Sequence, residues 1–216
     1  MKYIRTFLPL ILLLGSVPLL QAQGSFDLAV GFGSVHDKAT GGGIDSVTGN
    51  SCTPSSAATC EATPGLGGLF MGFFGDGMLN KHIGIGGALS FQPTKGNYGP
   101  LQYRQLFYDF NGIYAPINRK RLQLRLEGGI GGAHSGFSYS QTSCVGTAVC
   151  QTQVTSFGAA SHFQVHVGAG VQFYVKPHIF LRPQFDFREV PGLTNQFGSD
   201  QVIGGTIWVG YNFGEM

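Results

Sequence analysis

The chain has 216 residues, with 35 Gly and 18 Phe, and only 11% of its residues are charged, against roughly 25% in an average soluble protein. Its formal net charge is +2 and no basic run is longer than three residues, which excludes most nucleic-acid partners. The glycines follow no three-residue period, so collagen is excluded as well. These properties indicate a Gly-rich, aromatic-rich chain with β character.

The N-terminus has the pattern of a secretory signal peptide. Lys2 and Arg5 precede an apolar stretch from Phe7 to Leu20, and Ala22 provides a small residue for cleavage. The alternative is an anchoring helix, but the stretch is about 14 residues long and contains two prolines, whereas a membrane span needs roughly 20 residues. We therefore expect residues 1–22 to be a signal peptide and residues 23–216 to form one β-barrel domain.

Four cysteines form two local pairs, Cys52 with Cys60 and Cys144 with Cys150, in segments rich in Ser, Thr and Ala. In an exported protein, such cysteines are expected to form disulfides that staple long loops. Three connectivities are possible. Neither pair has the Cys-x2-4-Cys spacing of a zinc site, and we expect no metal and no cofactor.

Large apolar residues alternate with Gly or polar residues along most of the chain, which is the pattern of strands with one apolar face. Eight segments show it: 26–33, 66–74, 82–91, 102–114, 122–130, 159–175, 179–188 and 202–213. Their connections alternate between long or medium loops (36–64, 93–100, 134–157 and 191–201) and tight turns (around Asp76-Gly77, 116–120 and 176–178).

Long and short connections that alternate along a meander place all long loops at one end of the sheet and all tight turns, with both termini, at the other. Many segments have nine or more residues, about the length that a tilted strand needs to cross a bilayer. The predicted fold class is therefore all-β: an eight-stranded antiparallel up-and-down transmembrane β-barrel.

The direction of the apolar face separates this fold from a soluble, lipocalin-like ligand-binding barrel. The polar face has many glycines and few solubilising Lys and Glu residues, so it would make a poor water-facing exterior. We expect it to face the lumen, while Leu, Ile, Val and Phe face lipid. Six aromatic residues near strand ends are expected at the bilayer interfaces: Tyr103, Tyr114, Tyr174, Phe180, Tyr211 and Phe213.

From Phe26 to Phe213 the chain resembles the small eight-stranded outer-membrane β-barrels of the outer-membrane protein A type. The segment Ile207-Trp208-Val209-Gly210-Tyr211-Asn212-Phe213 looks like the last strand that these proteins present to the outer-membrane assembly machinery, although three residues follow Phe213 here. The resemblance implies a location in the bacterial outer membrane, with long loops outside the cell and tight turns in the periplasm. Outer-membrane lipid and the assembly machinery are the implied partners.

Extrapolation of the alternation places ten ionisable side chains in the lumen. Because isolated charges in a side-chain-filled barrel cost several kcal/mol, we expect an ion network that plugs the lumen, with a narrow, weakly selective pore as the alternative. The residues are Asp27, His82, Asp109, Arg125, Glu127, His162, His166, Arg182, Asp186 and Arg188.

We expect no catalytic site. The adjacent residues Ser161-His162 and His134-Ser135 point to opposite faces of their strands, and the lipid-facing positions offer no His next to a Ser. His162 and His166 are roughly 13 Å apart along one strand, at about 3.3 Å per residue, which is too far for a shared metal ion.

The sequence therefore predicts a monomeric outer-membrane barrel with a structural or surface-interaction role, whose stapled loops could bind an extracellular ligand. The alternatives are a narrow, weakly selective pore, a lipid A-modifying barrel enzyme and a soluble lipocalin-like ligand-binding barrel.

Overall fold

The computed structural model describes residues 25–37, 43–45, 51–52, 59–62, 65–98, 101–145 and 149–214. The predicted signal peptide, residues 1–22, lies outside the described residues. No helix within these ranges is long and apolar enough to cross a bilayer.

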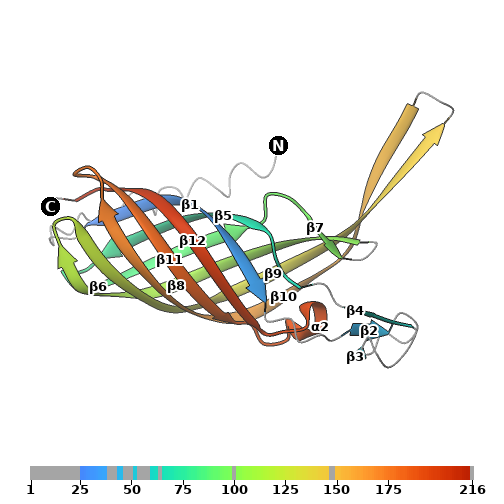
Figure 1. Cartoon of the computed structure of the whole chain (residues 1–216), viewed down its shortest axis with the longest axis horizontal. Coiled ribbons are helices and arrows are strands. Elements are labelled where there is room, and N and C mark those ends of the chain that lie inside the picture. Colours follow the sequence, from blue (N-terminus) through green and yellow to red (C-terminus); the bar gives the residue numbers. More distant parts are fainter. Residues whose placement is uncertain are drawn as a thin grey trace, which may run out of the picture.

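Eight long strands close into an antiparallel barrel, which confirms the predicted fold (Figure 1). Each strand pairs with its chain neighbour around the wall, and β1 pairs with β12 to close the ring. The strands are β1 (Phe26–Asp37), β5 (Leu69–Met78), β6 (Ile83–Phe91), β8 (Leu101–Arg119), β9 (Leu122–Val145), β10 (Val149–Tyr174), β11 (Ile179–Glu189) and β12 (Gln201–Asn212).

The pairing register shows that the strands are tilted relative to the barrel axis. A path of paired residues that starts at Phe26 passes through Gly77, Ile85, Gly112, Gly128, Val167, Phe187 and Ile203 and returns to β1 at His36, ten residues further along the chain. This stagger is what closes a tilted eight-stranded barrel whose lumen is just wide enough to be filled by side chains.

The two faces of the wall have inverted polarity relative to a soluble protein. Leu28 and Val30 are 46% and 45% exposed on the outside of β1, whereas the neighbouring Asp27 is completely buried. The same alternation continues around the barrel, with Phe, Leu, Ile and Val outside and Asp, Arg and Gln inside. The apolar face therefore faces lipid, as expected, and the lipocalin-like alternative is wrong.

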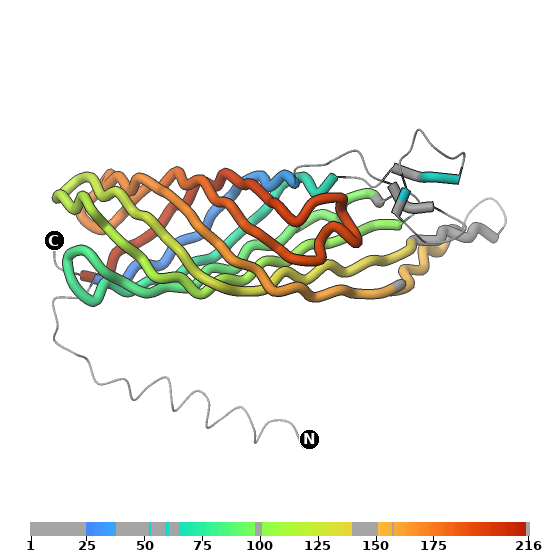
Figure 2. The backbone as a smooth tube through the Cα atoms, turned by 90° about the horizontal axis from the view of Figure 1, so that it is seen from below, coloured from blue at the N-terminus to red at the C-terminus, as the bar shows by residue number. Residues whose placement is uncertain are grey.

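Three short turns and the C-terminal end of β12 gather at one end of the barrel, as expected (Figure 2). The N-H of Phe213 donates to the carbonyl of Phe26 at this end (2.7 Å). The predicted turn at Asp76-Gly77 is wrong: β5 continues to Met78, because the Asp76 carboxylate faces the lumen and pairs with arginines there. The turn predicted at 116–120 is also shifted, since β8 continues to Arg119.

At the opposite end, β9 and β10 continue far beyond the other strands (Figure 1). The predicted loop 134–157 is therefore largely a hairpin, because its residues pair from His134 with Ser161 up to Val145 with Val149, with one register shift between Ser156 and Gly158. Short elements lie in the other connections: β2 (Gly43–Asp45), β3 (Ser51–Cys52) and β4 (Cys60–Ala62) form a small sheet, β7 (Gly96–Tyr98) pairs with β8, and α2 (Thr194–Phe197) is a single turn.

The aromatic residues divide between the two faces. Tyr114, Tyr211 and Phe213 are 52%, 43% and 57% exposed, which fits an interfacial belt. Tyr103 and Phe180 are buried inside the barrel, so their expected interfacial position is wrong. Tyr174 also faces inward, because it accepts a hydrogen bond from the lumen residue Gln172.

Candidate functional site

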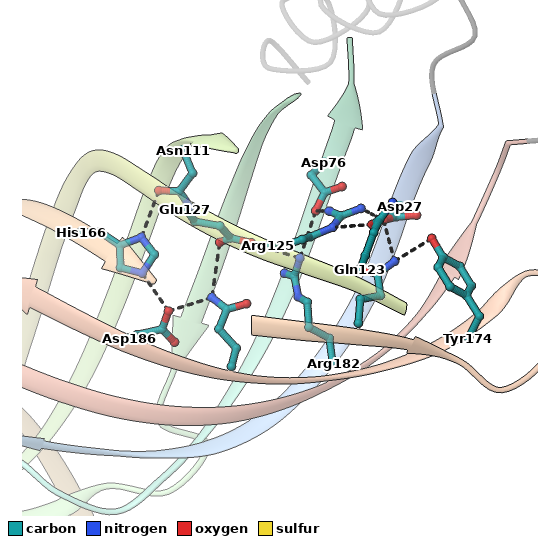
Figure 3. Close-up of polar contacts among 12 residues, drawn as sticks. Asp27, Asp76, Asn111, Gln123, Arg125, Glu127, His166, Tyr174, Arg182 and Asp186 are labelled. Carbon is teal, nitrogen blue, oxygen red and sulfur yellow. Dashed lines mark hydrogen bonds and ion pairs between the residues drawn. The ribbon is translucent and has the colours of Figure 1, made fainter. Parts of the chain in front are cut away.

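Arg125 on β9 is the centre of a buried ion network in the lumen (Figure 3). Its Nη2 atom lies 2.5 Å from Asp27 Oδ2 on β1, and its Nη1 atom lies 2.6 Å from Asp76 Oδ2 on β5. One planar guanidinium thus bridges two carboxylates from neighbouring strands on the other side of the barrel. Gln123 Oε1 accepts from Arg125 Nε (3.0 Å), which fixes the orientation of the guanidinium.

Arg182 on β11 extends the network toward the end of the barrel that carries the β9–β10 hairpin. Its Nη1 atom lies 3.4 Å from Asp76 Oδ2 and 3.1 Å from Glu127 Oε1. Its guanidinium carbon lies 3.9 Å from the centre of the Phe74 ring. Arg182 is therefore held by two carboxylates and by a cation–π contact.

Two further ion pairs lie nearer the hairpin end of the barrel than these arginines. The Nε2 atom of His166 lies 2.9 Å from Asp186 Oδ1, and its Nδ1 atom lies 3.0 Å from Asn111 Oδ1 (Figure 3). Arg188 lies 3.3 Å from Asp109, which also accepts a hydrogen bond from Gln164. Glutamines surround the charges and donate further hydrogen bonds to the carboxylates: Gln172 donates to Asp27 Oδ2, which Arg125 also contacts, and Gln184 donates to Asp186 Oδ1.

The structure brings eight of the ten ionisable residues predicted in the lumen into this cluster: Asp27, Asp109, Arg125, Glu127, His166, Arg182, Asp186 and Arg188. His162 does not join it, because it lies nearer the rim, where its Nε2 atom is 2.8 Å from Gln196 Oε1. His82 is exposed at the turn between β5 and β6, and its Nδ1 atom lies 2.8 Å from the carbonyl of Ala115. Asp76 was missed because the Asp-Gly dipeptide also favours turns.

An apolar cluster fills the mouth of the barrel at the end that carries the β9–β10 hairpin. Phe197, Leu193 and Val190 from the β11–β12 connection are completely buried there. The ring of Phe197 contacts that of Tyr103 with the centroids 4.9 Å apart, and the N-H of Thr194 donates to Asp200 Oδ1 (2.8 Å). An apolar plug therefore closes the mouth of the lumen, beyond the ion pairs.

The β9–β10 hairpin is the most prominent feature outside the membrane-spanning wall (Figure 1). The neighbouring strand β8 follows β9 only as far as Ser138, and β11 follows β10 only from Val165 onward. Between residues 153 and 164, no described strand pairs with β10 on the side away from β9. Val154 is 55% exposed and Tyr139 is 42% exposed.

The structure describes a disulfide for one of the two predicted cysteine pairs and only the backbone positions for the other. A disulfide joins Cys52 and Cys60, whose Cα atoms are 5.9 Å apart. The register places Cys144 directly opposite Cys150 on the hairpin. Their side chains lie outside the described residues, and the second disulfide stays a prediction.

The expectation that no His lies next to a Ser on the lipid-facing side is wrong. His134 and Ser161 are cross-strand neighbours on the outside of β9 and β10, and His134 Nδ1 lies 2.8 Å from Ser161 Oγ. The sequence alternation could not show this pair, because it depends on the register between two strands. Among the described residues, no carboxylate is hydrogen-bonded to His134, and no three His, Cys, Asp or Glu side chains are grouped to hold a metal ion.

A closed eight-stranded barrel with an apolar exterior and a charged, side-chain-filled lumen defines a class, the bacterial outer-membrane β-barrel proteins. Residues 7–213 match the family described as "Outer membrane protein beta-barrel domain", and the chain belongs to this family. The protein is therefore located in the bacterial outer membrane, in contact with its lipid. No curated protein matches the chain.

The solved structures that share the fold include Ail and OprG. Ail, the attachment invasion locus protein of Yersinia pestis, crystallised with the heparin analogue sucrose octasulfate, has a TM-score of 0.51 and 13% identity, with 88% of this chain and 99% of Ail covered. The outer membrane protein OprG from Pseudomonas aeruginosa has a TM-score of 0.50 and 14% identity, with 88% and 96% covered. At these identities the similarity shows the fold alone.

Proposed function

We propose that the protein is a surface-interaction protein that binds extended polypeptide segments by adding them as a strand to the outer edge of β10. The observation that carries this proposal is the edge from residue 153 to residue 161, which projects beyond β11. Peptides that bind in this way gain backbone hydrogen bonds along an open sheet edge.

The sequence of the hairpin supports this function. Residues 135–164 contain no Lys, Arg, Asp, Glu or Pro. Natural proteins usually protect exposed edges with charges or proline, because an open edge otherwise recruits other strands. A register shift between Ser156 and Gly158 bends the edge without blocking it by charge.

The surrounding charges favour an uncharged polypeptide over a polyanion. The extracellular end carries Asp37, Glu189 and Asp200, against Lys95 and Arg104, within the described residues. Carboxylates here would repel a sulfated ligand such as the heparin analogue bound to Ail, whereas they would not repel an uncharged strand.

The experiment uses a fluorescent peptide of alternating Thr and Val and the same peptide N-methylated at alternate residues. We expect the barrel in detergent micelles to bind the first peptide and to bind the methylated one at least about tenfold more weakly, because N-methylation removes backbone donors. Val154→Lys/Ser156→Lys is expected to weaken binding, while the control Val154→Thr/Ser156→Thr keeps it. Equal binding of both peptides would contradict strand addition.

We further propose that the protein acts as a monomer without catalytic activity and that β12 is recognised by the assembly machinery. The His134–Ser161 pair has no described carboxylate to orient the imidazole, which supports the absence of catalysis. The test is incubation with a fluorophosphonate probe that labels activated serines. Labelling of the wild type that disappears in Ser161→Ala would contradict this proposal and favour the lipid-modifying alternative.

A further inference from the structure

Basic residues concentrate on the three periplasmic turns of the barrel, which gather at the end that holds the C-terminus (Figure 2). All five side chains are exposed: Lys81 on the β5–β6 turn, Arg119, Lys120 and Arg121 on the β8–β9 turn, and Lys176 on the β10–β11 turn. These positions hold five of the eleven Lys and Arg residues that follow the predicted signal peptide, and three of the others are in the lumen.

Hydrogen bonds make the three turns one continuous surface. Asn118 Nδ2 on the β8–β9 turn donates to the carbonyl of Lys81 on the β5–β6 turn (2.9 Å). The N-H of Tyr174, at the end of β10, donates to the carbonyl of Arg121 (3.1 Å). The five cations therefore lie along one arc of the periplasmic rim rather than at scattered positions.

No acidic residue balances this arc within the described chain. Residues 79–82, 118–121 and 175–178 contain no Asp or Glu, and none of the five cations takes part in a described ion pair. The opposite end of the barrel carries Asp37, Glu189 and Asp200. The molecule thus has a basic periplasmic rim and a more acidic extracellular rim.

The height of the arc relative to the apolar belt indicates its partner. Exposed apolar residues flank the cations directly in sequence: Leu79 and Ile83 enclose Lys81, and Val175, which is 71% exposed, precedes Lys176. Ile117, 41% exposed, lies two residues before Arg119. Long basic side chains next to a lipid-facing belt place their charges at the level of the lipid headgroups.

From this arrangement we infer that the periplasmic turns bind the phosphate groups of anionic phospholipids in the periplasmic leaflet, with phosphatidylglycerol as the simplest example. Each guanidinium or ammonium group gains an ion pair with a headgroup phosphate, for which no carboxylate on these turns competes. The arc of cations would collect anionic lipid along the periplasmic rim and hold this rim at a fixed depth.

The test measures lipid selectivity by electron spin resonance in phosphatidylcholine vesicles that contain either spin-labelled phosphatidylglycerol or spin-labelled phosphatidylcholine. We expect the wild type to immobilise the anionic label preferentially. Arg119→Gln/Lys120→Gln should lower this preference at least about fivefold, because each of the two basic residues near an anionic surface contributes roughly 1 kcal/mol, which is about fivefold. Added salt is expected to lower the wild-type preference.

The matched control is Lys95→Gln/Arg104→Gln, which also removes one Lys and one Arg but at the extracellular end, and it should keep the preference. Gel mobility with and without boiling checks that each variant is a closed barrel. Equal immobilisation of both labels by the wild type, or an equal loss in the control, would overturn the inference. The inference would also be overturned if Arg119→Gln/Lys120→Gln left the lipid selectivity unchanged but reduced the sedimentation of the protein with purified peptidoglycan. That result would assign the arc to the cell wall instead.

Discussion

The mouth and the middle of the lumen are filled by opposite kinds of chemistry. At the mouth, Phe197 and its apolar neighbours exclude water by packing, whereas in the middle Arg125 and its partners are buried charges that tolerate burial only as a set. Removing an apolar side chain loses contacts, but removing one partner of a buried ion pair leaves an uncompensated charge. The two levels should therefore respond differently to substitution.

The largest effect is expected for Arg125→Ala. It leaves Asp27 without its cation and should lower the free energy of unfolding by about 3–5 kcal/mol. Urea unfolding of the barrel in lipid vesicles measures it. The triple variant Arg125→Ala/Asp27→Asn/Asp76→Asn should recover much of the loss, because it removes the orphaned charges as well. A triple variant less stable than the single one would show that packing, rather than charge, dominates.

A smaller and more local effect is expected for Phe197→Ala at the mouth. Loss of a buried Phe costs about 3 kcal/mol at the lower end of the usual range, and relaxation of the connection 190–200 should confine the opening to the plug. Hydrogen exchange should become faster in α2 but not in β9. The control Phe110→Ala removes a lipid-facing ring that is 72% exposed, and it should leave this exchange unchanged. Faster exchange along the whole of β9 would contradict a local plug.

Gly31→Ala should cost about 1–3 kcal/mol through overpacking. A Cβ atom at Gly31 would lie 2.3 Å from Trp208 Cε3, so the indole would have to move within a filled lumen. The control Gly205→Ala has no heavy atom within 4 Å of the added Cβ atom. Urea unfolding of the two variants compares them, and equal stability would show that the lumen has spare room beside the indole.

The second disulfide, in the hairpin, should contribute least to stability, because it closes only a short loop. Residues directly opposite each other on antiparallel strands have Cα atoms about 4.5–5.5 Å apart, which suits a disulfide, so we expect Cys144 to be bonded to Cys150. Non-reducing peptide mapping by mass spectrometry tests this bond. A peptide linking Cys144 to Cys52 or Cys60 would contradict the register-based pairing.

The alternation of residue types was enough to predict the strands, the inverted faces and most of the lumen charges, because a period of two directly reports the two faces of a strand. It could not predict Asp76 as a lumen residue, since Asp-Gly is also a turn signal. The His134–Ser161 contact depends on register, and the plug around Phe197 depends on a connection that folds back into the mouth. These features are tertiary, and no local pattern encodes them.

The position of Trp208 decides what the intrinsic fluorescence of this protein reports. It is the only tryptophan of the chain, it is 2% exposed, and its ring meets that of Phe74 inside the barrel rather than facing lipid. Brominated lipids should therefore quench its emission weakly even when the protein is fully inserted. Because Trp208 on β12 pairs with Gly31 on β1, a blue shift during refolding would time the joining of the first and last strands, separately from adsorption to the bilayer.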